Sequence, residues 1–235
     1  ERERPRLRQV RAQVVAVKVL ELFSGTRSIG KAFERRGHEV YSVDYDEKFE
    51  ASSHADIGCF GVRDALDLCG GVPDVIWASP DCTTYSVAAL GRHRRADPET
   101  GWLMPVTEYA KVCDAVNQHL MRLILRLDPE FWFVENPRAA MRRMPWMGGL
   151  PRYTVTYCQY GFPYMKPTDI WTNHPDPQFK PPCRNGDPCH EPAPRGSKSG
   201  LQAVDGKRMR GVIPRELCEH VVDICERSHV QRTLF

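Results

Sequence analysis

The chain has 235 residues, of which 41% are hydrophobic and 27% charged, values typical of a globular protein with one substantial core. The net charge of +3 is too small to establish a nucleic-acid partner by itself. Nine scattered cysteines, an arginine-rich start without a signal-like segment and the absence of a long apolar run argue against a disulfide-stapled or membrane protein. We therefore expect a cytoplasmic protein with no membrane partner.

Short apolar runs alternate with helical patterns through the first half of the chain. A run rich in valine and leucine at residues 14–23 predicts a buried strand, and residues 28–37 then have helical spacing that stops at Gly37. Further strands are predicted at residues 39–43, 72–78 and 131–134, and a long amphipathic helix at residues 108–127. This alternation predicts an α/β, Rossmann-like, doubly wound and mainly parallel sheet.

The character of the sequence changes after about Pro145. Residues 172–200 are crowded with Pro, Gly, Asn, Asp and Ser, so little helix is expected there, whereas residues 214–228 again have helical periodicity. We divide the chain into an α/β domain, a small loop-rich insert and a C-terminal helical segment. Their predicted bounds are 14–150, 151–205 and 206–235.

Three ends of predicted strands carry residues suited to a ligand with an adenosine group. They are Phe23, Ser24, Gly25, Thr26, Ser28 and Ile29 at the first, Asp44 and Tyr45 at the second, and Asp56 and Ile57 at the third. Ligands of open parallel sheets bind at such ends, and a glycine there lets a ligand approach the backbone. Each acid alone could equally be a surface carboxylate. The order and spacing of the three segments favour a binding site.

A thiol and a carboxyl group follow two of the later strands. Cys82 lies just past the strand predicted at residues 72–78, and Glu135 ends the strand that begins at residue 131. A lone cysteine is most often an inert core residue, but this one lies among turn-forming and polar residues. If the two strands are neighbours, the pair is a candidate nucleophile and acid/base group.

These segments together resemble the cytosine-5 DNA methyltransferase family. The resemblance is carried by residues 21–26, Asp44, Asp56, residues 80–86, 135–137, 160–163, 166–168 and 212–214. It spans roughly residues 17–225, in the family's order. The shortness of the chain and the segment at 171–200 are most similar to compact members from phages and prophages of bacterial hosts.

The resemblance implies an S-adenosylmethionine methyltransferase fold that modifies double-stranded DNA, and a monomer suffices for that task. Cys82 would attack carbon 6 of a cytosine flipped out of the helix, Glu135 would hydrogen-bond the ring, and Lys166 would position Cys82 or the DNA. Ser79 and Pro80 would complete the cofactor site formed by the three strand ends. The expected DNA contacts are Thr83, Ser86, Arg92, Arg94, Arg95, Asn136 and Arg195. The insert would serve as a target-recognition region.

Departures from the family pattern leave alternatives open. Asp81 stands where the family has proline and should raise the pKa of the neighbouring thiol unless it points away. Arg27 replaces a glycine. We expect it to point to solvent, although it could bind a carboxylated form of the cofactor and so give a carboxymethyl product. Lys166 and Thr168 replace a usual pair of arginines. A catalytically silent DNA- or cofactor-binding relative, or an enzyme acting on RNA, therefore remains an alternative.

The insert contains Cys183, Cys189 and His190. A loop-rich segment can be stapled by zinc, but this spacing is not that of a standard zinc finger, and adjacent Cys and His rarely ligate one ion comfortably. We therefore expect no metal, with these three residues as the candidates if zinc is bound. The alternative is that the insert contacts DNA bases from its loops, through donors such as Arg184, Asn185 and Gln202.

Overall fold

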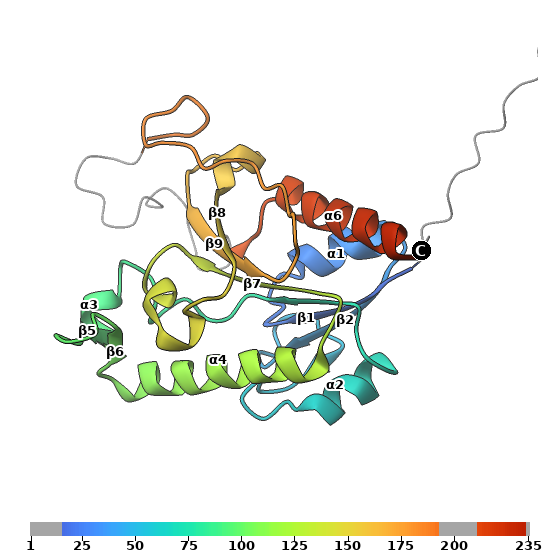
Figure 1. Ribbon diagram of the computed structural model, residues 1–235, viewed down its shortest axis with the longest axis horizontal. Helices are drawn as coiled ribbons and strands as arrows, with labels where there is room; N and C mark the ends of the chain where they lie inside the picture. Colours follow the sequence, from blue (N-terminus) through green and yellow to red (C-terminus); the bar gives the residue numbers. More distant parts are fainter. Residues whose placement is uncertain (1–15, 193–210, 234–235) are drawn as a thin grey trace, which may run out of the picture.

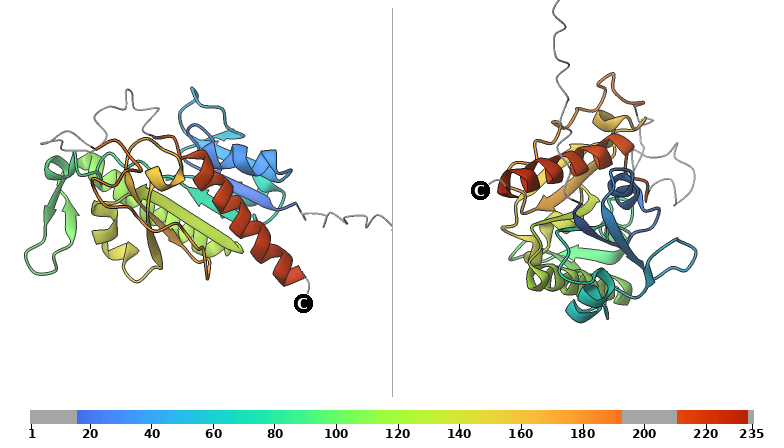
Figure 2. Two further views of the ribbon diagram at one scale, coloured as in Figure 1. Left: turned by 90° about the horizontal axis from the view of Figure 1, so that it is seen from above. Right: turned by 90° about the vertical axis from the view of Figure 1, so that its right-hand side faces the viewer.

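The computed structural model describes residues 16–192 and 211–233, and these residues form a three-layer α/β structure (Figures 1 and 2). The central sheet has seven strands in the order β3-β2-β1-β4-β7-β9-β8. Their bounds are β1 Lys18–Leu22, β2 Glu39–Asp44, β3 Ser53–His54, β4 Val75–Ala78, β7 Phe131–Pro137, β8 Arg152–Thr156 and β9 Pro167–Thr172. All run parallel except β9, which is antiparallel to both of its neighbours.

Helices cover both faces of this sheet. α1 and α6 lie side by side on one face, and α2 and α4 lie on the other (Figure 1). Their bounds are α1 Ser28–Arg35, α2 Val62–Cys69, α4 Glu108–Leu127 and α6 Arg215–Thr233. The predicted doubly wound, mainly parallel fold is thus confirmed. No helix in the described ranges combines the length and apolarity that crossing a membrane would need.

The alternation of side chains along each strand divides the core into two clusters. In β4, Ile76 and Ala78 point toward α2 and α4, whereas Val75 and Trp77 point toward α1 and α6. All four are at most 1% exposed, which explains why the strand reads as a continuous apolar run. On α4, Leu120, Ile124 and Leu127 repeat at helical spacing and fill the first cluster.

Several short helical turns and a two-stranded hairpin lie in the connections between the strands of the sheet. A small hairpin extends from one end of the molecule, as the left view of Figure 2 shows. It follows the helical turn α3 Leu90–His93 and consists of β5 Arg94–Ala96 and β6 Leu103–Pro105. Three 3-10 turns lie later in the chain, η1 Ala140–Arg143, η2 Pro145–Met147 and η3 Tyr157–Tyr160. The sequence patterns predicted none of these short elements, because they are too brief to show a period.

The loop-rich region predicted at residues 151–205 begins inside the main sheet. β8 and β9 pair with each other, and β9 pairs with β7, so this hairpin completes the central sheet. The chain after β9 has no helix or strand through residue 192. Residues 193–205 lie outside the described residues. The division into three units at residues 150 and 205 stays a prediction.

Candidate active site

The turn between β1 and α1 has an unusual backbone conformation. Phe23, Gly25 and Arg27 have positive φ angles of 55°, 47° and 56°. For the two residues with a side chain this conformation costs on the order of 1 kcal/mol each, so the surroundings must fix it. Asp44 does so at the end of β2, where its Oδ2 accepts the N–H of Gly25 at 2.8 Å. A Cβ atom on Gly25 would meet nothing within 4 Å, so the turn faces open space.

The end of the chain returns to this turn. The hydroxyl groups of Thr26 and Ser28 are 2.8 Å apart, and the Ser28 hydroxyl also accepts the N–H of Ile213 at 3.4 Å. Ile29, the next residue of α1, is fully buried against the cluster that α6 completes. The segment before α6 therefore lies beside the first turn of α1.

A buried carboxyl group, at the start of the segment 21–26 that carries the resemblance, supports the same helix. Glu21 in β1 is 2% exposed, and burial raises its pKa to about 7 against the backbone N–H groups of Gly30 and Ile29, which lower it. A Cβ atom on Gly30 would lie 2.5 Å from the Glu21 carboxylate, so only glycine leaves room for this contact. Glu21 thus ties the N-terminal turn of α1 to the sheet.

The second predicted segment offers one buried acid and one exposed ring. Asp44 is 6% exposed, and its Oδ1 accepts the N–H of Asp46 at 3.0 Å. Each oxygen of Asp44 keeps a second lone pair, so the carboxylate can accept further hydrogen bonds. Tyr45 is 73% exposed and is free to stack on a planar ligand.

The two residues of the third predicted segment, Asp56 and Ile57, lie in different environments. Asp56 is exposed, and its Oδ1 accepts the N–H of Gly58 at 2.8 Å. It lines a surface pocket of about 380 Å³ between β3 and α2. The Asp56 carboxylate therefore has open space beside it in which a ligand could donate a hydrogen bond. Ile57 is only 3% exposed and packs in the core, so its side chain contributes to the fold rather than to a surface contact.

Cys82 lies in a tight turn directly after β4. Its carbonyl accepts the N–H groups of Tyr85 and Ser86 at 3.0 and 2.8 Å. The Asp81 carboxylate accepts the N–H and hydroxyl of Thr83 at 2.8 and 2.6 Å and the hydroxyl of Tyr109, and its charge still raises the pKa of the neighbouring thiol. The carboxylate that replaces the family's proline therefore fixes the turn that presents Cys82.

The neighbouring strand places Glu135 at the same edge of the sheet. β4 and β7 are parallel and pair Ala78 with Val134, so Glu135 follows one residue beyond this register. The Asn136 amide donates to the carbonyl of Pro80 at 3.0 Å, which joins the two strand ends. Asn136 is fully buried. It is therefore a positioning residue here rather than the surface DNA contact that the resemblance implied.

Tyr157 and Lys166 complete this group. The Tyr157 hydroxyl donates to Glu135 at 2.9 Å, and the Lys166 ammonium lies 4.3 Å from the centre of the Tyr157 ring. Burial, and then the charges of Glu135 and Asp81, raise the pKa of Cys82 to about 11, and the charge of Lys166 opposes that shift. Burial lowers the pKa of Lys166, and the charges of Glu135 and Cys82 oppose that shift. The predicted trio of thiol, carboxylate and amine is thus brought together.

Tyr157 could not be found from the patterns considered. It lies in η3, ahead of the segment at residues 160–163 that carries the resemblance, and a lone tyrosine after a strand resembles any core residue. Its role follows only from the pairing of β8 with β9, which brings η3 back to Glu135.

The structure corrects the role expected for Arg94. Its side chain is fully buried, pairs with both oxygens of Asp114 at 2.7 and 3.0 Å, and donates to the carbonyl and hydroxyl of Thr84. The guanidinium also lies 4.2 Å from the centre of the Tyr85 ring. A guanidinium with these contacts cannot reach phosphates. It fixes the segment after Cys82 to α4 instead.

The remaining candidates lie on or near the surface around the same turn. Thr83, Arg92 and Arg95 are exposed, and Ser86 is partly exposed. Ser79 and Pro80 lie between β4 and Cys82, where the Ser79 hydroxyl accepts the indole N–H of Trp77 at 2.8 Å. Arg195 lies outside the described residues.

Arg27 also differs from the expectation that it points to solvent. Its side chain is 9% exposed and forms ion pairs with Glu34 and Glu50, the second at 3.0 Å. Two carboxylates already balance the guanidinium charge. The residue closes the turn against α1 instead of extending into water.

A curated protein shares sequence with this chain. The "Probable DNA (cytosine-5)-methyltransferase" of Frog virus 3 (isolate Goorha) is 32% identical over 168 residues, which cover 67% of this chain and 71% of the viral protein. This chain belongs to the DNA (cytosine-5)-methyltransferase family. No family model matches it.

Part of this chain also aligns with solved structures of methyltransferases. A DNA modification methyltransferase encoded within an E. coli prophage aligns with this chain at a TM-score of 0.49 and 16% identity, over 67% of this chain and 46% of that chain. The S. pombe Dnmt2 methyltransferase aligns at a TM-score of 0.46 and 12% identity, over 66% of this chain and 49% of that chain. This methyltransferase spans about half the length of these solved proteins.

Membership of this family implies S-adenosylmethionine as the cofactor, and the residues present fit such a group. The Ser24 hydroxyl is buried with no hydrogen-bond partner among the described residues, so it has a lone donor to offer. Gly25 faces open space, Asp44 can accept ribose hydroxyls, and Tyr45 is free to stack. The N-terminus of α1 points to the same turn and favours an anionic group.

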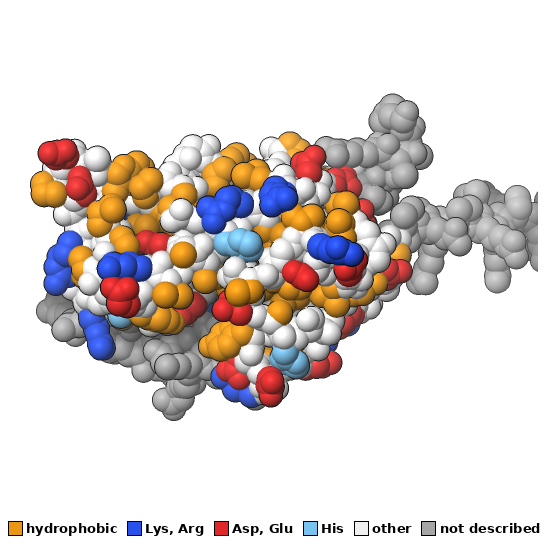
Figure 3. Space-filling model, turned by 90° about the horizontal axis from the view of Figure 1, so that it is seen from below, with side chains coloured by type: hydrophobic (Ala, Val, Ile, Leu, Met, Phe, Trp, Pro, Cys, Tyr) orange, Lys and Arg blue, Asp and Glu red, His pale blue; other side chains and the backbone are white. Residues whose placement is uncertain are grey.

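The face of the methyltransferase formed by α2 and α4 offers no continuous basic surface. Figure 3 shows acidic and basic side chains interspersed with apolar ones over this face. A surface of mixed sign attracts phosphates weakly. The exposed Arg92 and Arg95 lie instead near the Cys82 turn.

Proposed function

We propose that this chain is an S-adenosylmethionine-dependent DNA methyltransferase that attacks carbon 6 of a flipped cytosine through Cys82 and methylates carbon 5. One observation carries the proposal. Cys82 and Glu135 lie at the carboxyl ends of β4 and β7, and Lys166 joins them from the connection between β8 and β9, in the same sheet as the turn that fits the cofactor. Ligands of open parallel sheets bind at this edge.

Carbon 5 of cytosine is a poor nucleophile, and Cys82 changes that. The thiol loses its proton to water, and the thiolate forms a bond to carbon 6, which makes carbon 5 electron-rich. S-adenosylmethionine, held by the turn between β1 and α1, would supply an electrophilic methyl group to carbon 5 and would leave as the neutral thioether when its sulfur–methyl bond breaks. Loss of the proton on carbon 5 and departure of the Cys82 thiolate restore the aromatic ring. Lys166 favours the thiolate because it is the positive charge that lowers the pKa of Cys82.

Glu135 stabilises the intermediate by hydrogen bonds to ring nitrogen 3 and the exocyclic amino group. The hydrogen bond from Tyr157 holds one carboxylate oxygen in place, so less reorganisation is needed when the base enters. Because Glu135 is buried and Cys82 is only partly exposed, the target base must leave the helix stack to reach them. Thr83 and Ser86 would flank the flipped base, and Arg92 and Arg95 would contact phosphates.

The test uses mixed-sequence duplex DNA, S-adenosylmethionine with a labelled methyl group, and the variants Cys82→Ala and Val72→Ala. Digestion to nucleosides and mass analysis should give labelled 5-methylcytosine with the wild type and with Val72→Ala, because Val72 is exposed and precedes β4, at the opposite end of that strand from Cys82. The product should vanish with Cys82→Ala. A duplex with 5-fluorocytosine should trap a covalent complex, because fluorine at carbon 5 prevents the elimination step.

Other outcomes would favour the alternatives. Cofactor binding without product on DNA or on a parallel transfer RNA would indicate a catalytically silent relative. Product on the transfer RNA alone would move the substrate to RNA, and a heavier carboxylated nucleoside would identify a different transferred group. Methylation that persists in Cys82→Ala would contradict the covalent mechanism.

A further inference from the structure

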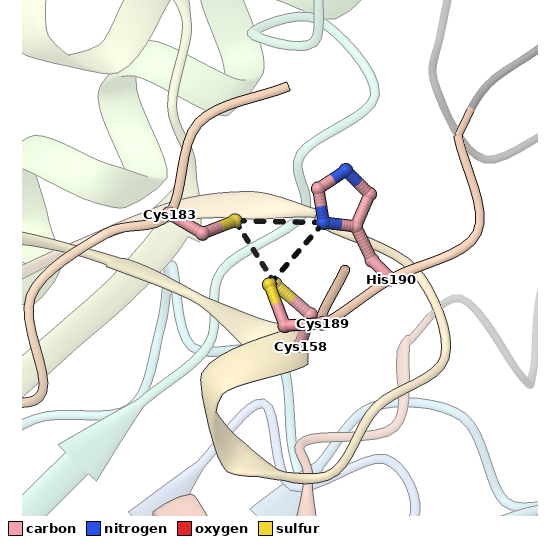
Figure 4. A group of neighbouring side chains, drawn as sticks. All are labelled: Cys158, Cys183, Cys189 and His190. Atoms are coloured by element: carbon pink, nitrogen blue, oxygen red, sulfur yellow. Dashed lines mark hydrogen bonds between the residues drawn. The ribbon is translucent and has the colours of Figure 1, made fainter. Parts of the chain in front are cut away.

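Four potential metal ligands converge at a point that involves none of Cys82, Glu135 and Lys166. They are Cys158, Cys183, Cys189 and His190, and their ligand atoms all lie within 4.8 Å of one another. Cys158 belongs to η3, and the other three lie in the loop that follows β9. Figure 4 shows the three sulfur atoms and Nδ1 of the histidine pointing toward a common centre.

The distances are those of a small tetrahedral site. The Cys158 sulfur is 3.1 Å from that of Cys183 and 3.7 Å from that of Cys189. His190 Nδ1 is 3.7 Å from the Cys183 sulfur and 3.4 Å from the Cys189 sulfur. A zinc ion with zinc–sulfur bonds of about 2.3 Å separates its tetrahedral sulfur ligands by about 3.8 Å. The cluster therefore needs only a slight expansion to hold the ion at its centre.

A disulfide accounts for the cluster less well. The shortest sulfur–sulfur distance of 3.1 Å is far beyond the bond length of about 2.05 Å. One disulfide would also use only two of the four groups. It would not explain why a third thiol and an imidazole nitrogen lie at the same point. Three thiols and an imidazole around one point are the donor set of a structural zinc site.

We propose that Cys158, Cys183, Cys189 and His190 bind a structural Zn²⁺ ion. Four protein ligands fill a tetrahedral shell and leave no position for water or substrate, so the ion has a structural rather than a catalytic role. The sequence-based objection was that adjacent Cys and His rarely share an ion. It is met here because the two side chains of Cys189 and His190 already point to the same centre.

Neighbouring groups hold the ligands in place. The side-chain amide of Gln159 donates to the Cys189 sulfur at 3.3 Å, and the Thr156 hydroxyl accepts the N–H of Cys183 at 3.0 Å. Hydrogen bonds of this kind orient ligands and stabilise thiolate sulfur. The loop is also joined to the chain near η3 by the N–H of Glu191, which donates to the carbonyl of Pro163 at 2.9 Å.

The ion would connect the loop after β9 to the structure beside the candidate active site. Cys158 directly follows Tyr157, whose hydroxyl holds Glu135. The segment between β9 and residue 192 has no helix or strand, and loop-rich segments of this kind rely on a metal for order when they lack a core of their own. The zinc thus fixes both the loop and the base of the Tyr157 turn. The inference does not depend on the proposed reaction.

The first experiment measures metal in the full-length protein purified under reducing conditions without chelator. Elemental analysis should find about one zinc ion per chain in the wild type and in Cys59→Ser, and less than about a tenth of that in Cys183→Ser. Cys59 is a matched control because it is an exposed free cysteine outside the cluster. Absence of stoichiometric zinc from the wild type, or an equal loss in Cys59→Ser, would overturn the proposal.

A second measurement covers the case in which Cys183→Ser fails to fold. The wild type is stripped of metal, reduced and titrated with Co²⁺ alone. We expect one equivalent to produce the thiolate charge-transfer and visible bands of tetrahedral cobalt, and His190→Cys to keep one equivalent with shifted bands, because a fourth thiolate replaces the imidazole. Saturation without these bands, or the same spectrum in wild type and His190→Cys, would contradict the four-ligand site. Neither readout requires methyl transfer, so failure here is distinct from failure of the proposed function.

Discussion

The Cys82 turn and the cysteine cluster both gather distant residues around one point, but by different means. Cys82 lies in the turn after β4 and Glu135 lies in the adjacent parallel strand β7, so strand pairing brings their segments together. The cluster joins η3 to a loop 25 residues further along the chain, with no strand pairing to enforce the contact. The first arrangement is fixed by the core and can hold strained or charged groups. The second needs its own bond, which the proposed zinc would provide.

Because of this difference, substitutions in the two regions should affect different properties, the reaction rate in one case and the stability of the fold in the other. A substitution at the sheet edge should alter the reaction and leave the fold intact, because the strands carry the geometry. A substitution that removes a buried tie outside the strands should alter the fold first. The variants that follow test that division, beginning with the largest expected effect.

Arg94→Met should cost about 3–5 kcal/mol of unfolding free energy, because it leaves the buried Asp114 carboxylate without its positive partner. Denaturant unfolding followed by circular dichroism measures the loss. Arg92→Met is the matched control, since Arg92 is exposed and should change stability by less than about 0.5 kcal/mol. Equal stability of the two variants would contradict the structural role assigned to Arg94, and would indicate that the sheet alone holds the Cys82 segment.

Glu135→Gln should lower the rate of methyl transfer by about 10²–10³-fold, as expected when one preorganised group is removed from an active site. The amide keeps an oxygen that can accept the Tyr157 hydroxyl, so the unfolding free energy should be almost unchanged. Single-turnover kinetics with saturating DNA measure the effect, and thermal unfolding supplies the control. A large loss of stability at an unchanged rate would show that Glu135 acts only in the fold.

Sequence patterns anticipated the sheet edge far better than the cluster. The order of strands and polar strand ends placed Cys82, Glu135, Asp44 and the glycine turn together, because topology constrains their positions. The DNA contact predicted for Arg94 was wrong. The sequence around this basic residue does not reveal that it forms a buried ion pair with Asp114 on α4. Cys158 was missed because it lies in a different element from its three partners. Contacts between loops produce no periodic pattern of apolar residues in the sequence, so the patterns that reveal helices and strands cannot reveal them.

Lys166→Met should slow alkylation of Cys82 by roughly tenfold at pH 8, because a neighbouring positive charge typically lowers a thiol pKa by about one unit or more. With the pKa of Cys82 raised to about 11 by burial, the thiolate is the minor form at pH 8. The rate should therefore rise about tenfold for each pH unit between pH 7 and 10. Iodoacetamide labelling, read from the Cys82 peptide by mass spectrometry, gives the profile. Lys180→Met is the control, since Lys180 is exposed and lies against Tyr160 rather than Cys82.

Asp81→Asn should act in the opposite direction and more weakly. Asp81 raises the pKa of Cys82, so removing its charge lowers that pKa and speeds alkylation at pH 8, by less than about threefold because exposed charges are screened by water. The asparagine retains an oxygen for Thr83, so the turn should persist.

The salt dependence of alkylation distinguishes the charge of Asp81 from that of Lys166. Raising the ionic strength to about 1 M should abolish the effect of the exposed Asp81, but should leave that of the buried Lys166 largely in place. A slower alkylation in Asp81→Asn would mean that the carboxylate matters for the shape of the turn more than for the charge of the thiol.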